Sequence, residues 1–217
     1  MDNEYIKQLE DTLRKFLVPV QDIPFTVVIK VLSGHRIIPI HENKIWADGF
    51  IAKLEEAIRI AGASASKKGI KAKRPNEAGN KIEDFVIEGL KAAGIPAQRP
   101  TTRLGKKKST GYPDFELEWR GIPIYLECKT FNADEERAGG LRVFYLSPSE
   151  DFKITKDAPH LLVAFGMKRS GESLFVPISY EIYTLESLRV NLKHEFNASA
   201  QELYLPESLL AYGEIKA

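Results

Sequence analysis

The stretch from residue 111 to residue 130, GYPDFELEWRGIPIYLECKT, predicts a β-hairpin around which the rest of the chain is organised. Apolar and acidic residues alternate from Asp114 to Trp119. On the second arm, one set of alternating residues is Ile122, Ile124, Leu126 and Cys128, and the other is Pro123, Tyr125, Glu127 and Lys129. Side chains two positions apart on a strand point to the same face. We therefore expect one apolar face that packs and one polar face that gathers charged groups.

The turn of this hairpin decides which polar side chains meet. If Arg120 and Gly121 form a two-residue turn, Asp114 lies directly opposite Glu127 on the neighbouring strand. Directly opposed Cβ atoms lie about 4.5–5.5 Å apart. Lys129 follows Glu127 by two residues, so the two share a face in any register. The polar face is thus predicted to hold two carboxylates and an ammonium group.

Two carboxylates at this distance repel each other, and one of them would bind a proton near neutral pH. A divalent cation removes the conflict, and oxygen ligands of this kind suit Mg²⁺. Lys129 can then take part in proton transfer, or offer positive charge to a phosphate oxygen or to a metal-bound water. The alternative is a hairpin whose polar face is simply solvated.

The elements around the hairpin indicate an α/β fold with a mixed sheet. Asn76 is a candidate N-cap for a helix from Glu77 to about Ala93. Steps of about 100° per residue place Glu83 at the margin of the apolar face of that helix, where it could point toward the carboxylate pair. The run from Pro159 to Phe165 is continuously apolar, as in a buried central strand.

Two domains are predicted, with a boundary near Gly62. Residues 1–62 read as a helix-rich N-terminal subdomain for dimerisation or DNA contact, and residues 63–217 as the catalytic core with a C-terminal extension. The subdomain holds a predicted helix over 3–17, a strand or buried helical turn over Phe25–Leu32, and a helix from about Ala47 to Ala61. Residues 62–74 are rich in Gly, Ala, Ser and Lys, which predicts a loop.

Cations gather in two segments that could bind the phosphate backbone of nucleic acid without reading its sequence. The first segment has Lys67, Lys68, Lys71, Lys73 and Arg74, and the second has Arg99, Arg103, Lys106, Lys107 and Lys108. The 132–140 loop and the pair Lys168 and Arg169 are weaker candidates for reading bases. Because the net charge of the whole chain is only +1, any polyanion must be bound by such local clusters.

The composition excludes several classes of protein. Cys128 is the only cysteine among 217 residues, which excludes an internal disulfide framework and fits a reducing compartment. The N-terminus lacks the apolar segment of a signal peptide, and no stretch is apolar enough to span a membrane, so we expect a cytoplasmic protein with no membrane partner. Zinc-ligand spacings, nucleotide-binding glycine loops and the serine-hydrolase elbow are absent.

With a helix bearing Glu83, then Pro113-Asp114, then Glu127-Cys128-Lys129, the chain resembles the PD-(D/E)XK nuclease superfamily, and most of all a Type II restriction endonuclease. The resemblance covers roughly residues 75–180, and the motif positions match without substitution. It implies a restriction-endonuclease-like core, in which a mixed central β-sheet is flanked by helices, with a helix-rich N-terminal addition.

The resemblance also implies roles for these residues. Asp114 and Glu127 would coordinate Mg²⁺, with Mn²⁺ as a substitute, and the backbone carbonyl of Cys128 would be a further ligand. Lys129 would orient or deprotonate the attacking water, and Glu83 matches an additional helix carboxylate.

The implied activity is Mg²⁺-dependent, sequence-specific hydrolysis of double-stranded DNA that leaves 5′-phosphates, carried out by a homodimer on a palindromic site. Two alternatives remain open at this point. One is a DNA repair nuclease or Holliday-junction resolvase that uses the same residues. The other is a non-catalytic nucleic-acid-binding module.

Overall fold

The computed structural model of the chain describes residues 3–18, 20–41, 49–73, 75–108, 111–134, 144, 146–147, 151–193, 201 and 206–208. The contacts divide the chain into two compact units. One unit is formed by Met1–Ile23 with Val190–Ala217, and the other by Pro24–Arg189. A separate role for residues 1–62 stays a prediction. Within the described residues, no helix is both long and apolar enough to cross a membrane.

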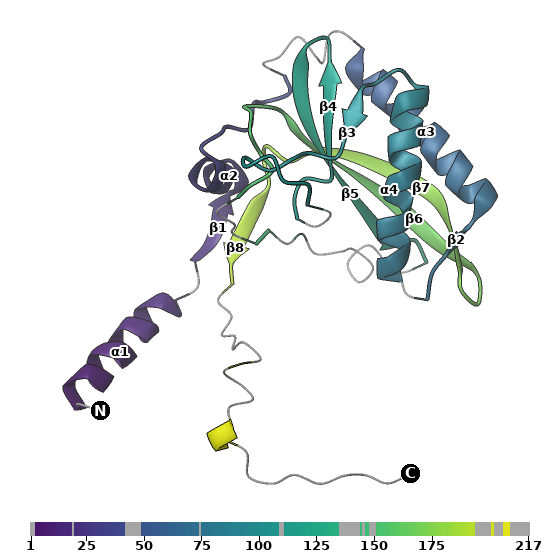
Figure 1. The fold of residues 1–217 in the computed structure, drawn as a ribbon. Helices are drawn as coiled ribbons and strands as arrows, with labels where there is room; N and C mark the ends of the chain where they lie inside the picture. The colour runs from purple at the N-terminus through teal and green to yellow at the C-terminus, as the bar shows by residue number, and fades with distance from the viewer. Residues whose placement is uncertain are drawn as a thin grey trace, which may run out of the picture. The chain divides into compact units, whose positions relative to one another are not determined.

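The larger unit is built on a six-stranded mixed sheet (Figure 1). In spatial order the strands are β2 (Ile70–Lys71), β7 (Leu174–Thr184), β6 (His160–Gly171), β5 (Ile122–Asn132), β4 (Phe115–Trp119) and β3 (Ala97–Gln98). Only the β5–β6 pair among these is parallel. The predicted α/β fold with a mixed central sheet is confirmed, and the apolar run that predicted a buried strand lies in β6.

The β4–β5 hairpin has the predicted register. Trp119 pairs with Ile122, and Phe115 pairs with Leu126 at the far end, without a bulge between them. Arg120 and Gly121 form the turn with φ of 50° and 80°. Positive φ at both central residues is the mark of a type I′ turn, whose twist matches that of the flanking strands. The turn therefore fixes which side chains of the two strands are opposed.

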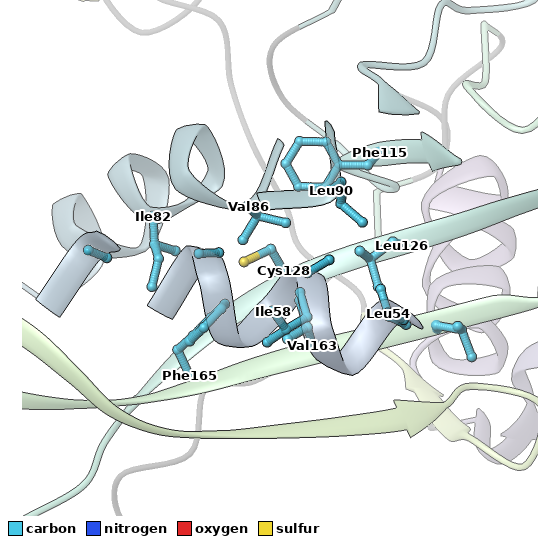
Figure 2. Packing of buried hydrophobic residues seen from close by; sticks show 14 of the residues in the cluster. Leu54, Ile58, Ile82, Val86, Leu90, Phe115, Leu126, Cys128, Val163 and Phe165 are labelled. Atoms are coloured by element: carbon cyan, nitrogen blue, oxygen red, sulfur yellow. The ribbon is translucent and has the colours of Figure 1, made fainter. Parts of the chain in front are cut away.

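Two helices, α3 (Phe50–Lys68) and α4 (Pro75–Ala92), pack against each other and cover one face of this sheet (Figure 1). Figure 2 shows the core between them, where the apolar face of the hairpin is buried. The labelled residues of this core are Leu54 and Ile58 of α3, Ile82, Val86 and Leu90 of α4, and Phe115, Leu126, Cys128, Val163 and Phe165 of the strands. The apolar face of the hairpin thus holds the sheet against its helices.

The loop predicted over residues 62–74 is wrong for its first part, because α3 continues to Lys68 and ends at Gly69. Of the small residues that suggested a loop, Ala65 is buried in the core, and Ala63, Ser64 and Ser66 are exposed on the helix. One turn earlier, Gly89 of α4 approaches Ala57 and Ala61 so closely that a Cβ atom on Gly89 would clash with the Ala57 carbonyl oxygen. Close packing against α4 thus accompanies the helix up to the segment that was predicted as a loop.

The segment that could be a strand or a buried helical turn forms the helix α2 (Phe25–Ser33). Phe25 and Ile29 are buried, whereas Val27 and Val31 are exposed. All four would share one face of a strand, so only the helical period separates the buried pair from the exposed pair.

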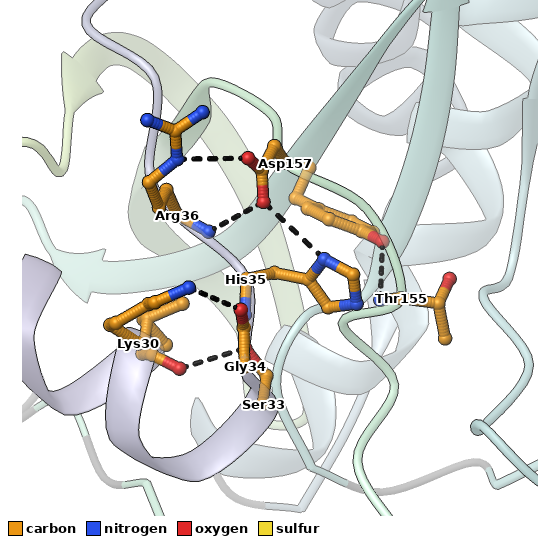
Figure 3. Close-up of polar contacts among 9 residues, drawn as sticks. Lys30, Ser33, Gly34, His35, Arg36, Thr155 and Asp157 are labelled. Atoms are coloured by element: carbon orange, nitrogen blue, oxygen red, sulfur yellow. Dashed lines mark hydrogen bonds and ion pairs between the residues drawn. The ribbon is translucent and has the colours of Figure 1, made fainter.

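A polar cluster ties the segment after α2 to the segment before β6 (Figure 3). Asp157 accepts hydrogen bonds from the backbone N–H and the Nε–H of Arg36, each at 2.9 Å, and lies 3.3 Å from Nδ1 of His35. The two bonds from Arg36 lower the pKa of Asp157 to about 2. Next to this cluster, the hydroxyl of Tyr125 on β5 accepts a hydrogen bond from the N–H of Thr155.

The smaller unit contains the helix α1 (Asn3–Phe16), as the sequence predicts for this segment. The strand β1 (Val20–Pro24) pairs with β8 (Arg189–Leu192) in a separate two-stranded sheet. A short 3₁₀ helix, η1, spans Pro206–Ser208.

The close approach of α3 and α4 predicts opposite effects for two Gly→Ala substitutions. Gly89→Ala should lower the free energy of unfolding by about 2 kcal/mol, because the new methyl group has no room against the α3 backbone. Gly62→Ala should be neutral or raise that free energy by up to about 1 kcal/mol, because its methyl would meet only Phe165 Cε1 at 3.6 Å. Urea unfolding measures the change in the free energy of unfolding for both variants. An equal loss of stability in the two variants would contradict this packing.

Candidate active site

Asp114 precedes β4 and is held against the second arm of the hairpin. Its Oδ2 accepts a hydrogen bond of 2.8 Å from the backbone N–H of Cys128. Because Cys128 points into the core on the apolar face, its neighbours Glu127 and Lys129 point to the other face. The bond therefore sets the Asp114 carboxylate beside Glu127.

Glu127 is a buried carboxylate with one unsatisfied oxygen. Its residue is 3% exposed, and its Oε1 accepts a hydrogen bond from Lys129. Its Oε2 is buried and has no hydrogen-bond partner among the described residues. Burial, followed by the charge of Asp114, raises the pKa of Glu127 to about 7, although Lys129 opposes the rise. A buried oxygen without a partner costs free energy unless a further group binds it.

Lys129 places a positive charge beside the carboxylates of Asp114 and Glu127. Burial alone lowers the pKa of Lys129, but the charge of Glu127 and the hydrogen bond to it raise the pKa more, so that it lies above its ordinary value. Lys129 is therefore an ammonium group near neutral pH. It is a donor of hydrogen bonds and charge rather than a ready proton acceptor.

The residues fit a hydrated Mg²⁺ ion. Asp114 and Glu127 supply carboxylate oxygens from neighbouring strands, and Glu127 Oε2 has no competing partner. Among the described residues, no group of three or more His, Cys, Asp or Glu side chains is arranged to hold a metal ion. Mg²⁺ keeps several waters and commonly takes only one or two carboxylates. The Cys128 carbonyl as a ligand stays a prediction.

Glu83 of α4 lies near the carboxylate pair but is engaged by another residue. Its Oε2 accepts a hydrogen bond of 2.7 Å from Arg99. Burial and the charge of Asp114 raise the pKa of Glu83, and Arg99 counteracts the rise. Arg99 also lies 3.5 Å from Asp84 and 5.8 Å from the centre of the Phe115 ring. The sequence placed Arg99 only in a cationic cluster, not beside the predicted site.

Lys153 is a further charged residue that the sequence did not identify. It is 5% exposed, and its Nζ donates to the carbonyls of Gly111 at 2.6 Å and Pro113 at 3.2 Å. Burial lowers the pKa of Lys153, while the charges of Asp114 and Glu127 raise it. The lysine holds the backbone that leads into Asp114. No spacing rule could find it, because it comes from a distant segment of the chain.

Tyr112 anchors the same backbone from its side chain. Its hydroxyl lies 2.6 Å from Nδ1 of His160, the first residue of β6, and both residues are buried. Burial lowers the pKa of His160 to about 3, so the ring is neutral and can accept the Tyr112 proton at Nδ1. The rings of Tyr112 and Tyr125 both pack on His160. The approach to Asp114 is thus fixed by packing as well as by Lys153.

The predicted DNA-binding cations lie at several places on the larger unit. Lys67 and Lys68 are in the last turn of α3. Lys68 and Lys71 line a cavity of about 660 Å³ with Lys81 and Phe85 of α4. The others that the structure describes are exposed: Lys73, Arg103, Lys106, Lys107, Lys108, Lys168 and Arg169. Arg74 and most of the 132–140 loop, residues 135–140, lie outside the described residues.

Lys168 and Arg169 belong to β6, which continues to Gly171, and Arg169 donates to the carbonyls of Gly171 and Glu172. Lys108 donates to the carbonyl of Asp151 at 3.1 Å. The described contacts bring Asp114, Glu127, Lys129 and Glu83 together, and they do not join these cations to the same cluster. Their role in DNA binding stays a prediction.

Comparison with known proteins identifies the group to which this chain is related. The model of the Type II restriction enzyme MjaV family matches residues 19–207. The chain is 37% identical over 231 aligned positions to the Type II restriction enzyme MjaV of Methanocaldococcus jannaschii, and the alignment covers 99% of each protein. No solved structure matches the chain significantly. From the extent of both matches, the chain belongs to the MjaV family of Type II restriction enzymes.

Proposed function

We propose that the protein is a Type II restriction endonuclease that hydrolyses double-stranded DNA at a specific sequence, with Mg²⁺ held by Asp114 and Glu127. One observation carries the assignment of the centre. In a chain of this family, the buried Oε2 of Glu127 has no partner and lies beside a second carboxylate and an ammonium group. Membership of the family favours this activity over a repair nuclease, a junction resolvase or a non-catalytic binding module.

In the proposed mechanism a water molecule attacks the scissile phosphorus in line. The bond from phosphorus to the 3′-oxygen breaks, which leaves a 5′-phosphate and a 3′-hydroxyl. Bound by Asp114 and Glu127, Mg²⁺ or Mn²⁺ would polarise the phosphate and stabilise its developing charge. Lys129 donates a hydrogen bond to the attacking water or to a phosphate oxygen, and the raised pKa of Lys129 favours this orienting role over proton abstraction.

Other residues hold this centre in place. Lys153 and Tyr112 fix the backbone before Asp114. Arg99 holds Glu83 near Asp114 but away from a ligand role as long as their ion pair persists. Release of Glu83 would let it join the metal site and let Arg99 bind a phosphate oxygen. The centre is therefore assembled from β4, β5, α4 and the loops beside them.

The partner in this proposal is double-stranded DNA, bound through its phosphates by the exposed cations near α3, on the 103–108 loop and on β6. Each centre cuts one strand, so a homodimer with twofold symmetry would cut both strands of a palindromic site. A cytoplasmic location would give the enzyme access to DNA.

Substitution at the centre should abolish cleavage. Lys129→Met should lower the rate by about 10²–10³-fold because it removes the donor beside the phosphate, and Glu127→Gln should also lower it severely. Glu116→Gln is the matched control, since Glu116 lies on β4 two residues after Asp114 but pairs with the exposed Lys156. Digestion of a complex DNA substrate with Mg²⁺ measures these rates. Wild-type cleavage by Lys129→Met would contradict the assigned centre.

Metal binding can be measured without DNA. Titration calorimetry with Mg²⁺ and Mn²⁺ should detect a site in the wild-type protein that is lost in both Asp114→Asn and Glu127→Gln, because each removes a carboxylate charge. Glu116→Gln should bind as the wild type does. If the Asp114 and Glu127 variants retained full affinity, the ion would have to bind elsewhere.

The raised pKa of Glu127 predicts a loss of stability with rising pH in the metal-free protein. Its folded pKa is about 7 against an ordinary value of 4.5. Between these values the unfolded chain releases a proton that the folded chain keeps, so the free energy of unfolding falls, by on the order of 3 kcal/mol. Urea unfolding of the wild type and of Glu127→Gln from pH 4 to pH 8 measures this loss in the free energy of unfolding, which the variant should not show. Added Mg²⁺ should reduce the loss in the wild type. If the free energy of unfolding depended on pH in the same way in both proteins, the raised pKa of Glu127 would be refuted.

A further inference from the structure

The face of the sheet that holds the proposed metal site extends over three strands. Directly paired residues of neighbouring strands share a face, and two rows of such residues run from β5 over β6 to β7. The rows are Glu127, Leu162 and Tyr183 and, two residues further along β5, Lys129, Ala164 and Glu181. Between Lys129 and Glu181, β6 thus contributes only a methyl group.

The packing of the core agrees with this placement. Val163 of β6 is part of the core beneath α3 and α4, and Ile182 of β7 packs against it. Their neighbours in the chain therefore point to the other face of the sheet. Glu181 and Tyr183 lie on that face, two strands away from Glu127, which is about 10 Å.

Tyr183 and Glu181 form a hydrogen-bonded pair at the surface. The hydroxyl of Tyr183 donates to Oε2 of Glu181, and Tyr183 is 45% exposed. The one hydroxyl proton is used within the pair, whereas a carboxylate and a phenol oxygen together have several lone pairs. The pair is consequently suited to accept hydrogen bonds from a ligand that carries donors.

We propose that Glu181 and Tyr183 read a base of the DNA substrate by accepting a hydrogen bond from the amino group of a cytosine or an adenine. This inference rests on the proposed function, because it takes the scissile phosphate to lie at Lys129. A DNA phosphate carries negative charge and has only acceptors, so Glu181 repels it. The amino groups of cytosine and adenine are donors in the major groove, and a carboxylate is one of the side chains that accept from cytosine there.

The distance from the proposed metal site fits a base close to the cut. Two strand spacings are about 10 Å, which is comparable to the depth of the major groove, about 8.5 Å. Successive base pairs lie about 3.4 Å apart along the duplex, so the base should lie within about three base pairs of the cut. Lys168, which the sequence suggested for base reading, is six residues beyond Leu162 on β6, or about 20 Å along the strand.

Cleavage of DNA of random sequence with Mg²⁺, followed by sequencing of the fragment ends, tests the proposal. The wild type should cut one sequence. Glu181→Gln exchanges one acceptor for a donor, and Tyr183→Phe removes the hydroxyl that orients the carboxylate. In both variants, discrimination at one position near the cut should fall by about tenfold or more. Titration calorimetry should show wild-type Mg²⁺ binding for both, because neither residue is a ligand of the proposed ion.

The chain offers a matched control on the other face of β7. The hydroxyl of Tyr180 donates to Oε1 of Glu55 on α3 at 3.2 Å, so the same chemical pair occurs on the helix side of the sheet. Tyr180→Phe and Glu55→Gln should keep wild-type discrimination at every position. Urea unfolding shows whether each of the four variants folds, and Tyr183→Phe alone decides the question if Glu181→Gln does not fold.

Substrate analogues test the same contact from the DNA side. In these substrates the cytosines and adenines near the cut are replaced, one at a time, by analogues that lack the amino group. The wild type should cut one of these substrates about tenfold more slowly than unmodified DNA, and Glu181→Gln should lose most of this difference. Such a double-mutant cycle isolates the contact between the base and the carboxylate from a general loss of activity.

Three results would overturn the proposal. They are wild-type discrimination by both Glu181→Gln and Tyr183→Phe, equal sensitivity of the wild type and Glu181→Gln to the missing amino groups, or loss of Mg²⁺ binding in Glu181→Gln, which would make Glu181 a metal ligand. These outcomes are separate from those for the proposed function. A wild type that leaves DNA intact would contradict the nuclease and this role together. A wild type that cuts one sequence, with variants of unchanged specificity, would contradict only the role of Glu181 and Tyr183.

Discussion

The close approach of the Asp114 and Glu127 carboxylates is the constraint on which the rest of the larger unit depends. Burial, followed by the charge of Asp114, raises the pKa of Glu127 to about 7. Three cationic side chains reduce the electrostatic free energy of these neighbouring carboxylates. Lys129 binds Glu127, Lys153 holds the backbone before Asp114, and Arg99 neutralises Glu83. One oxygen of Glu127 still has no partner. This is the oxygen that the proposed metal ion would bind.

The hairpin satisfies this constraint because one of its faces packs into the core and the other holds the charged residues. Its apolar face, including Cys128, is buried under α3 and α4, so the strands cannot shift without losing core contacts. A slip of one residue would turn Glu127 and Lys129 into the core and Cys128 toward solvent. The type I′ turn at Arg120 and Gly121 fixes the same register locally. Turn geometry and core packing therefore determine together where the carboxylates lie.

The sequence predicts this part of the structure because its signals are local. Strand alternation and the two-residue turn involve neighbouring residues, and they were sufficient to predict the register of the β4–β5 pair. Lys153 and Arg99 come near the site through long-range contacts, which no spacing reveals. The segment after Ala61 was predicted as a loop because Gly62 has a low helix preference and the segment has no large apolar residues at helical spacing. The close packing of Ala57 and Ala61 depends on Gly89, which lies on another helix.

The hairpin and α1 show how one kind of pattern can be buried to different degrees. Both are amphipathic, but the apolar face of the hairpin is covered by helices of its own unit, and α1 has no buried residue. A covered face gives rigidity, which the carboxylate pair needs because two like charges must be held together. An exposed face keeps its free energy of burial available for association.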